Sequence, residues 1–322
     1  MDKIELEFKE RFIKDFNLPI QIPIPPYFDY FIDLYEEDYG SKTKYQNILK
    51  EVGSRFSGSY GKYLDHYYKV RDVIIKDIED SVGYKDFCIN PDFSVIYPNP
   101  GEIKSDLYTG AEVGKRFMSI DLKEANFQSL RFYDTFIVKN KETYKEFVKT
   151  YDESPNFSES KYTRQVIFGK LNVKRQIQLE KYIIGRIHEE ISNIFPKDFI
   201  VFSKQTDELI FRLPDYYISS GELETKISSI IREKVNVNVK VEIFTTGMLQ
   251  LFTKNGHSIV GITKTYSYPK EKHPTLHRVP GIYFSQMYKY WKGLEINPIY
   301  DLAFIYERQL AHFDYELSTT NG

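Results

Sequence analysis

Hydrophobic residues recur at two different spacings along the chain, and these predict where helices and strands form. Helical spacing predicts helices over residues 65–81, 124–133, 141–151, 162–194 and 219–234. Alternating or uniformly apolar runs predict strands over residues 86–97, 117–120, 199–202, 209–213, 235–243, 249–252 and 258–263. Helical structure is expected again over 283–313. The prolines between residues 18 and 26 forbid a helix there, so an extended segment follows a short N-terminal helix.

The order of these elements from residue 117 to residue 243 is strand, helix, strand, strand, helix, strand. This order is typical of the split βαβ, or ferredoxin-like, α+β arrangement. Its first and third strands lie side by side at the centre of the sheet. The end of the first strand, at Asp121, should therefore approach the start of the third, at Asp207 and Glu208.

Composition excludes several classes of protein. The 322 residues are 41% hydrophobic and 28% charged, which fits neither an integral membrane protein nor a chain too polar to fold. The single cysteine, Cys88, cannot form a disulfide within the chain, so a reducing compartment is expected. With no apolar leader at Met1 and no long apolar run, we expect a cytoplasmic protein. The abundance of Lys, Ile, Tyr and Asn favours a virus-encoded chain acting in its host cell.

The formal net charge of −2 hides an uneven distribution of charge. Seven Lys or Arg residues face one acidic residue within 161–186, and the same ratio recurs within 254–292. Two basic segments in a neutral chain are typical of a protein that binds a polyanion with one face, although two solvated surfaces would show the same pattern.

Asp121, Asp207 and Glu208 are candidate metal ligands. Carboxylates brought together repel one another, and a divalent cation such as Mg²⁺ or Mn²⁺ relieves this repulsion. Each acid also has a simpler explanation: Asp121 could cap the following helix, and Asp207 and Glu208 could form an ordinary polar turn.

The segment Phe117–Phe127 resembles motif A of right-hand nucleic acid polymerases, in the forms found in reverse transcriptases and family A DNA polymerases. The segment Thr206–Phe211 resembles motif C of family A, and 164–172 resembles the finger helix called motif B. The three segments stand in the family's order and, with a weak Lys-x-Tyr resemblance at Lys264 and Tyr266, cover about half the chain. Thr206 replaces the family A histidine, and Asn126 stands where reverse transcriptases favour an aromatic residue.

The resemblance implies a polymerase palm over 115–266, preceded by a mostly helical region, 1–114, and followed by a helical, thumb-like region, 267–322. It implies a template-directed nucleotidyltransferase, a compact polymerase or primase-like enzyme, that uses two metal ions. Asp121, Asp207 and Glu208 would be catalytic, and the backbone carbonyl of Leu122 would complete the metal shell.

The resemblance also implies residues that bind substrates. Arg164, Lys170 and Lys174 would bind the nucleoside triphosphate, although they could equally form a solvated helix face. Aromatic and cationic side chains are interspersed within 266–291 and could stack on bases and neutralise phosphates, although the same pattern could equally reflect amphipathic packing. We expect nucleic-acid binding by Lys264, Tyr266, Arg278 and Lys289.

Two other functions remain open. The chain could be a non-catalytic nucleic-acid-binding accessory protein in a replication or transcription assembly, since it has no recognisable exonuclease domain. It could also be an enzyme that cyclises or joins nucleotides, because the same fold and metal pair serve that chemistry.

Overall fold

The computed structural model describes residues 2–319 as two compact units, each treated by itself below. The central unit consists of Tyr67–Thr245 and Tyr266–Lys272. The terminal unit consists of both ends of the chain, up to His66 and from His273, together with Thr246–Thr265. This division differs from the three consecutive regions expected, because the two ends of the chain fold together.

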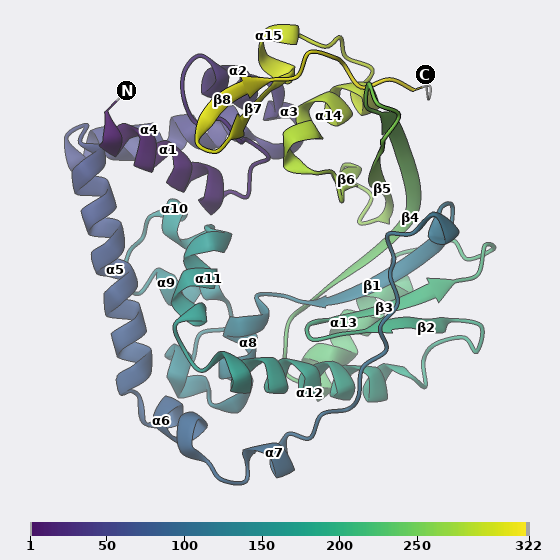
Figure 1. Cartoon of the computed structure of the whole chain (residues 1–322). Coiled ribbons are helices and arrows are strands. Elements are labelled where there is room, and N and C mark those ends of the chain that lie inside the picture. Colours follow the sequence, from purple (N-terminus) through teal and green to yellow (C-terminus); the bar gives the residue numbers. More distant parts are fainter. Residues whose placement is uncertain (1, 320–322) are drawn as a thin grey trace. The chain divides into compact units, whose positions relative to one another are not determined.

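The central unit contains a sheet with a long helix, α12 (Val173–Ile191), running along it, and several other helices of the unit lie away from the sheet (Figure 1). Its strands are β1 (Arg116–Leu122), β2 (Ile200–Lys204) and β3 (Glu208–Leu213), and parts of β4 (Val239–Phe252) and β5 (Ser258–Tyr268). Its helices are most of α5 (Tyr60–Asp80), then α6 (Val82–Ile89), α7 (Phe93–Ile96), η1 (Gly110–Glu112), α8 (Ala125–Tyr133), η2 (Thr135–Val138), α9 (Tyr144–Val148), α10 (Pro155–Ser158), α11 (Lys161–Gly169), α12 (Val173–Ile191) and α13 (Glu222–Lys234).

The strand order in the sheet is β2-β3-β1-β4-β5-β6, where β6 is Thr275–His277. β1 pairs antiparallel with both β3 and β4, so the expected contact between the first and third strands is confirmed. The fold is therefore mixed α and β with an antiparallel sheet of six strands.

The two faces of the sheet differ because side chains alternate along each strand. One face carries Ile120 and its paired neighbours Leu209 and Val241, which are all buried. Helix α12 contacts β3 on this side, where His188 lies against Phe211. The opposite face carries Phe117, whose buried neighbours form an apolar cluster: Leu107, Ile210 and Phe244.

The terminal unit combines helices from both ends of the chain with parts of β4 and β5. Its helices and strands are α1 (Lys3–Asp15), α2 (Tyr27–Leu34), α3 (Glu36–Tyr39), α4 (Ser41–Phe56), β6, η3 (Gly281–Tyr283), α14 (Phe284–Lys292), α15 (Pro298–Asp301), β7 (Ala303–Tyr306) and β8 (Gln309–His312). The carboxylate of Asp301, only 1% exposed, accepts hydrogen bonds from Tyr30 and Ser285. Tyr30, near the start of the chain, and Ser285 and Asp301, near its end, therefore form one buried hydrogen-bonded group inside this unit.

Four predictions of secondary structure differ from the structure. The runs 235–243 and 249–252, predicted as separate strands, both contribute to the single strand β4. Residues 86–97 form parts of α6 and α7 rather than a strand: the Ser81 side chain caps α6, and Tyr84 and Phe87, one helical turn apart, are buried. The apolar residues between 86 and 97 are too few for their spacing to distinguish a helix from a strand.

The chain past residue 302 forms the hairpin β7–β8 rather than a helix. Glu307 and Arg308 both adopt positive φ, as a two-residue hairpin turn requires.

The single helix predicted over 162–194 is two helices. α11 ends at Gly169, and α12 begins after Asn172, whose side-chain Oδ1 accepts a hydrogen bond from the backbone N–H of Arg175. Asparagine at this position favours a new helix start over continuation. None of the helices that the structure describes is both long enough and apolar enough to cross a membrane.

Candidate functional site

Asp121 and Glu208 lie directly opposite each other on β1 and β3. On its other side Asp121 pairs with Lys240 of β4, so one row across the sheet reads Glu208, Asp121, Lys240. We call the two carboxylates of this row, Glu208 and Asp121, the acidic row. Paired side chains on neighbouring strands lie on the same face, with Cβ atoms about 5 Å apart. The sheet thus places two carboxylates side by side, which destabilises it unless something compensates.

The neighbouring row orients one of these carboxylates. Ser119, two residues before Asp121, donates a hydrogen bond from Oγ to Glu208 Oε1 at 2.5 Å. Asp207 lies exposed in the turn between β2 and β3, and its backbone oxygen accepts a hydrogen bond of 2.8 Å from the N–H of Leu122. This bond brings the β2–β3 turn to the end of β1. The structure therefore brings together Asp121, Asp207 and Glu208, as the sequence predicted.

A third acid of this face, on β4, is already paired with cations. Glu242, opposite Ser119, lies 2.6 Å from Lys240 Nζ and 2.5 Å from Lys272 Nζ. These ammonium groups keep the pKa of Glu242 low even though burial opposes this. Lys272 Nζ also lies 3.6 Å from the centre of the Tyr266 ring. Cationic groups therefore border the acidic row on the β4 side.

Burial raises the pKa of Asp121 to about 7, and the carboxylates of Glu208 and Asp207 contribute to this rise. Lys240 acts in the opposite direction but does not compensate. At neutral pH a substantial fraction of Asp121 is therefore protonated. A group whose charge is this unfavourable is a candidate for binding a cation, because the cation would supply the missing positive charge.

Glu180 of α12 is a functional candidate that the sequence analysis missed. The residue is 4% exposed, and its Oε1 has no hydrogen-bond partner among the described residues. Burial raises its pKa to about 8, and the negative charge of Asp207 contributes to this. The only available signal was an acid on the apolar face of a predicted helix, a signal that does not reveal its proximity to Asp207.

Arg164 of α11 lies beside the segment that follows β1. Its Nη1 is 3.9 Å from Glu124 Oε1, and its guanidinium lies 5.8 Å from the centre of the Tyr144 ring. The Nε of Arg164 is buried without a hydrogen-bond partner among the described residues. A buried donor of this kind is suited to an anionic ligand.

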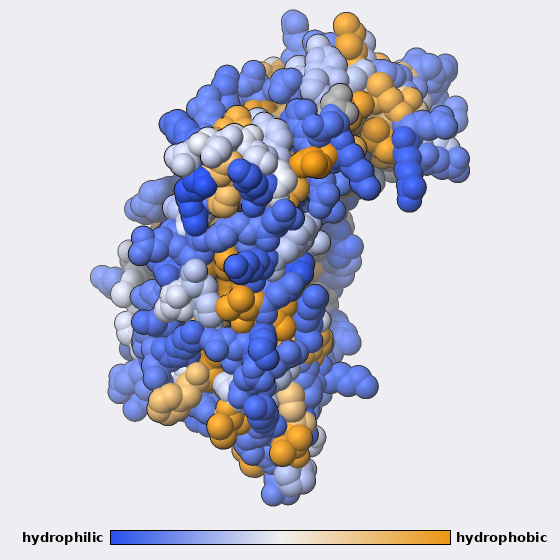
Figure 2. Space-filling model, turned by 90° about the vertical axis from the view of Figure 1, so that its left-hand side faces the viewer, coloured by the Kyte–Doolittle hydropathy of each residue, from blue (hydrophilic) through white to orange (hydrophobic). Residues whose placement is uncertain are grey.

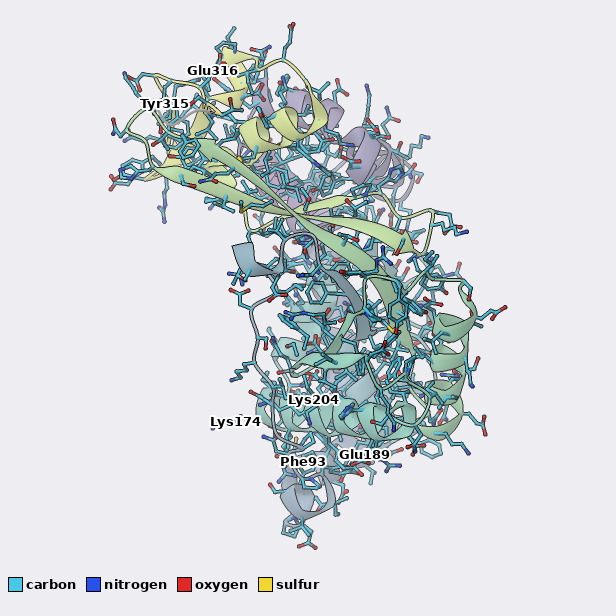
Figure 3. All side chains as sticks on the ribbon, turned by 90° about the vertical axis from the view of Figure 1, so that its right-hand side faces the viewer. Phe93, Lys174, Glu189, Lys204, Tyr315 and Glu316 are labelled. Carbon is cyan, nitrogen blue, oxygen red and sulfur yellow. The ribbon has the colours of Figure 1, made fainter. Side chains whose placement is uncertain are left out.

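The other two residues predicted to bind the triphosphate do not share a helix face. Lys170 follows the end of α11, whereas Lys174 lies in the first turn of α12 (labelled in Figure 3). Both side chains are exposed, and the break at Asn172 separates them.

The residues predicted to bind nucleic acid are divided between the two units. Tyr266 belongs to the central unit, where it packs on Phe244. Lys264 and Lys289 belong to the terminal unit and are 8% and 7% exposed. Lys289 Nζ lies 2.7 Å from Asp301 Oδ2 and donates to the backbone oxygen of Glu295, so its charge is already paired inside the unit. This placement does not support a nucleic-acid contact by Lys289.

Arg278 lies at the surface of the terminal unit. It is exposed and stands just after β6, in the left-handed region at φ 63°. Its proposed contact with nucleic acid stays a prediction.

The acidic row fits the chemistry of a hard divalent cation only in part. Oxygen ligands from Asp121 and Glu208 suit Mg²⁺ or Mn²⁺. However, no group of three or more His, Cys, Asp or Glu side chains within residues 2–319 is arranged to hold a metal ion together. A cation here would therefore depend on two carboxylates and on oxygens from water or a phosphate substrate, a coordination that Mg²⁺ commonly adopts.

Comparisons with known proteins do not add to this description. No family model matches the chain, and neither the curated proteins nor the solved structures yield a similar one.

Proposed function

We propose that the chain is a magnesium-dependent nucleotidyltransferase built on a palm-like sheet. The observation that carries this proposal is the pair Asp121 and Glu208, two carboxylates directly opposite each other on adjacent strands. Their repulsion lowers the stability of the sheet, and the raised pKa of Asp121 expresses the same cost. A pair of carboxylates whose repulsion lowers the stability of the fold is more consistent with ligand binding than with a structural role.

The strand order supports the palm interpretation. β1, which ends just after Asp121, lies between β3 and β4, and the β2–β3 turn presents Asp207 next to it. This agrees with the placement that motifs A and C imply. Helix α12 covers the opposite face, so the face with the acidic row has Phe117 and Phe244 at its other end.

Each residue has a defined role in the proposed reaction. Asp121 and Glu208 would hold the divalent cation through carboxylate oxygens, Asp207 would add negative charge beside them, and the cation when bound would neutralise phosphate charge. Ser119 orients Glu208 through its hydrogen bond. Arg164 would donate its unpartnered Nε to a phosphate oxygen of the nucleotide. Lys240 and Lys272 would add positive potential at the border of the row.

A non-catalytic nucleic-acid-binding protein is the second candidate. The observation that favours it is the lack of a three-residue metal group within the described part of the chain. Such a protein would bind nucleic acid without a divalent cation, and its affinity would fall steeply with salt.

The test is incorporation of labelled nucleotides into primed and unprimed DNA and RNA templates with Mg²⁺ or Mn²⁺. We expect incorporation by the native chain and a loss of at least about 100-fold in Asp121→Asn and Glu208→Gln. Asp215→Asn, which changes an exposed acid of the same unit, is the matched control and should keep full activity. Undiminished activity in the two site variants would reject the proposal, and metal-independent binding without incorporation would favour the second candidate.

A further inference from the structure

The central unit carries an unusual group of exposed apolar side chains near α6, α7 and η2. Most large apolar residues of this unit are buried, but five in this region are between 48% and 83% exposed: Val82, Ile89, Val95, Ile96 and Phe136. Figure 2 shows hydrophobic residues gathered at the lower end of the view, where Figure 1 places α6 and α7. Single exposed apolar residues are ordinary, but a group of this kind marks an interaction surface.

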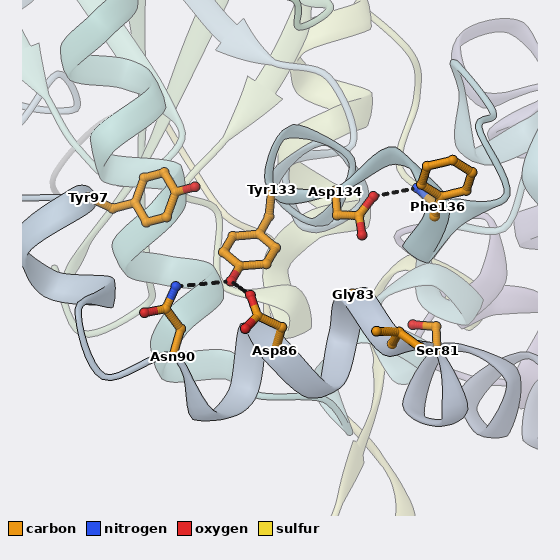
Figure 4. A pocket seen from close by; sticks show the side chains of 9 residues that line it. Ser81, Gly83, Asp86, Asn90, Tyr97, Tyr133, Asp134 and Phe136 are labelled. Atoms are coloured by element: carbon orange, nitrogen blue, oxygen red, sulfur yellow. Dashed lines mark hydrogen bonds between the residues drawn. The ribbon is translucent and has the colours of Figure 1, made fainter.

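A hollow of about 730 Å³ lies within this group. Val82 lines it. Phe136 and the rings of Tyr97 and Tyr133 line it as well, and the two tyrosines form aromatic walls (Figure 4). Val82, Asp86 and Ile89 follow one another at spacings of four and three on α6, so they form one stripe on this face. We name the hollow and this stripe the α6–η2 surface.

The walls of the hollow are held in place by internal contacts. Tyr133 donates its hydroxyl hydrogen to Asp86 and accepts a hydrogen bond of 3.3 Å from Asn90 Nδ2 (Figure 4). Asp134 Oδ1 accepts the N–H of Phe136 at 2.9 Å. Gly83 allows α6 to approach η2 closely, since a Cβ at this position would lie 2.1 Å from Asp134 Oδ2. The shape therefore exists before any ligand binds.

The charge of the hollow is negative. Asp86 and Asp134 line it, and no Lys or Arg is among its lining residues. Within the described chain the structure records no ion pair for either carboxylate; each instead accepts a hydrogen bond from a neutral donor. Nucleic-acid phosphates and anionic membranes would be repelled by this charge, whereas a cationic group would be attracted.

We propose that the α6–η2 surface binds a segment of a partner protein that inserts an apolar side chain into the hollow and places a Lys or Arg next to it. The apolar side chain would pack between Val82, Phe136 and the tyrosine walls. The cationic group would pair with Asp86 or Asp134. Apolar burial supplies affinity and the carboxylates supply selectivity for basic segments. This inference is independent of any reaction at Asp121.

The experiment is a selection from a phage-displayed library of random peptides, each about 12 residues long, on the full chain. We expect enriched peptides to combine large apolar residues with Lys or Arg. A synthetic peptide of the enriched sequence should bind in fluorescence anisotropy, and Val82→Ser with Phe136→Ser should weaken it at least tenfold. Asp86→Asn with Asp134→Asn should weaken it at low salt and remove most of its salt dependence.

The matched control is the pair Ile200→Ser and Ile218→Ser, which changes two apolar residues of the same unit that are 62% and 83% exposed. This pair should leave affinity within twofold. The proposal is overturned if no peptide is enriched, if enriched peptides lack basic residues, or if they bind the Val82 and Phe136 variant as well as the native chain. Self-association that this variant abolishes, measured by sedimentation velocity, would also overturn it, because the occupant would then be a second copy.

Discussion

Two like charges facing each other across β1 and β3 are the most informative feature at the level of single residues. The strand register holds the backbone of Asp121 opposite that of Glu208, so both carboxylates start from neighbouring positions on one face of the sheet. Between about pH 4 and pH 7 the folded chain keeps a proton on Asp121 that the unfolded chain releases. The folded state binds more protons in this window, so the contribution of Asp121 to stability falls as pH rises.

Asp121→Asn removes this charge while keeping a similar shape. We expect the variant to be more stable than the native chain at pH 8 by at least about 1 kcal/mol, since one pKa unit corresponds to about 1.4 kcal/mol. At pH 4 the difference should nearly vanish, because Asp121 is then largely protonated in the folded state. Urea unfolding at both pH values measures this. Asp215→Asn is the control, and an Asp121→Asn variant that is less stable than the native chain at pH 8 would contradict the prediction.

At the level of single elements, the close packing of α12 against a neighbouring segment leaves no space for a side chain at one glycine. Gly185 lies in the middle of α12, where glycine is normally unfavourable. A Cβ at this position would lie 2.6 Å from Cβ of Pro100, which is closer than carbon atoms approach. The glycine therefore allows α12 to contact the segment around residue 100 in the same unit.

Gly185→Ala should destabilise the central unit by about 1 kcal/mol, because the overlap with Pro100 costs about 1–3 kcal/mol and the better helix propensity of alanine recovers up to about 1 kcal/mol. Gly169→Ala, at the end of α11 with no atom within 4 Å of the added Cβ, should be neutral or slightly stabilising. Thermal and urea unfolding of both variants give the comparison. Equal effects of the two substitutions would show that helix propensity alone decides.

At the level of the whole molecule, both ends of the chain form the terminal unit. Asp301 of α15 connects them, because it accepts hydrogen bonds from Tyr30 of α2 and Ser285 of α14 and pairs with Lys289. Removing one partner from a buried ion pair leaves the other charge uncompensated.

Asp301→Ala should therefore destabilise the terminal unit by about 3 kcal/mol. Hydrogen exchange measured by mass spectrometry should show loss of protection in α2 as well as in α14, although α2 is far from residue 301 in the sequence. Asp314→Ala is the control: its pair with Lys254 is largely exposed, so its effect on stability should be small. Unchanged protection of α2 in Asp301→Ala would contradict this role.

The sequence alone determined the elements that have strong local signals and the order in which they occur. The runs 117–120 and 209–213 are apolar and short enough to be strands, and the polar turn before Glu208 predicts a hairpin, so the central position of β1 followed from element order. This placed Asp121 beside Asp207 and Glu208. Local signals failed where a few residues fit two structures, as over 86–97, or where one side chain such as Asn172 starts a new helix.

Only the tertiary structure decided which charged groups are buried and which are paired. Glu180 and Lys289 have ordinary sequence surroundings, but Glu180 is buried near Asp207, and Lys289 is paired with Asp301. The α6–η2 surface also depends on contacts between segments separated in the sequence, since Gly83 must approach Asp134. Burial and ion pairing depend on which residues lie close together in three dimensions, and the spacing of residues along the chain does not determine those distances.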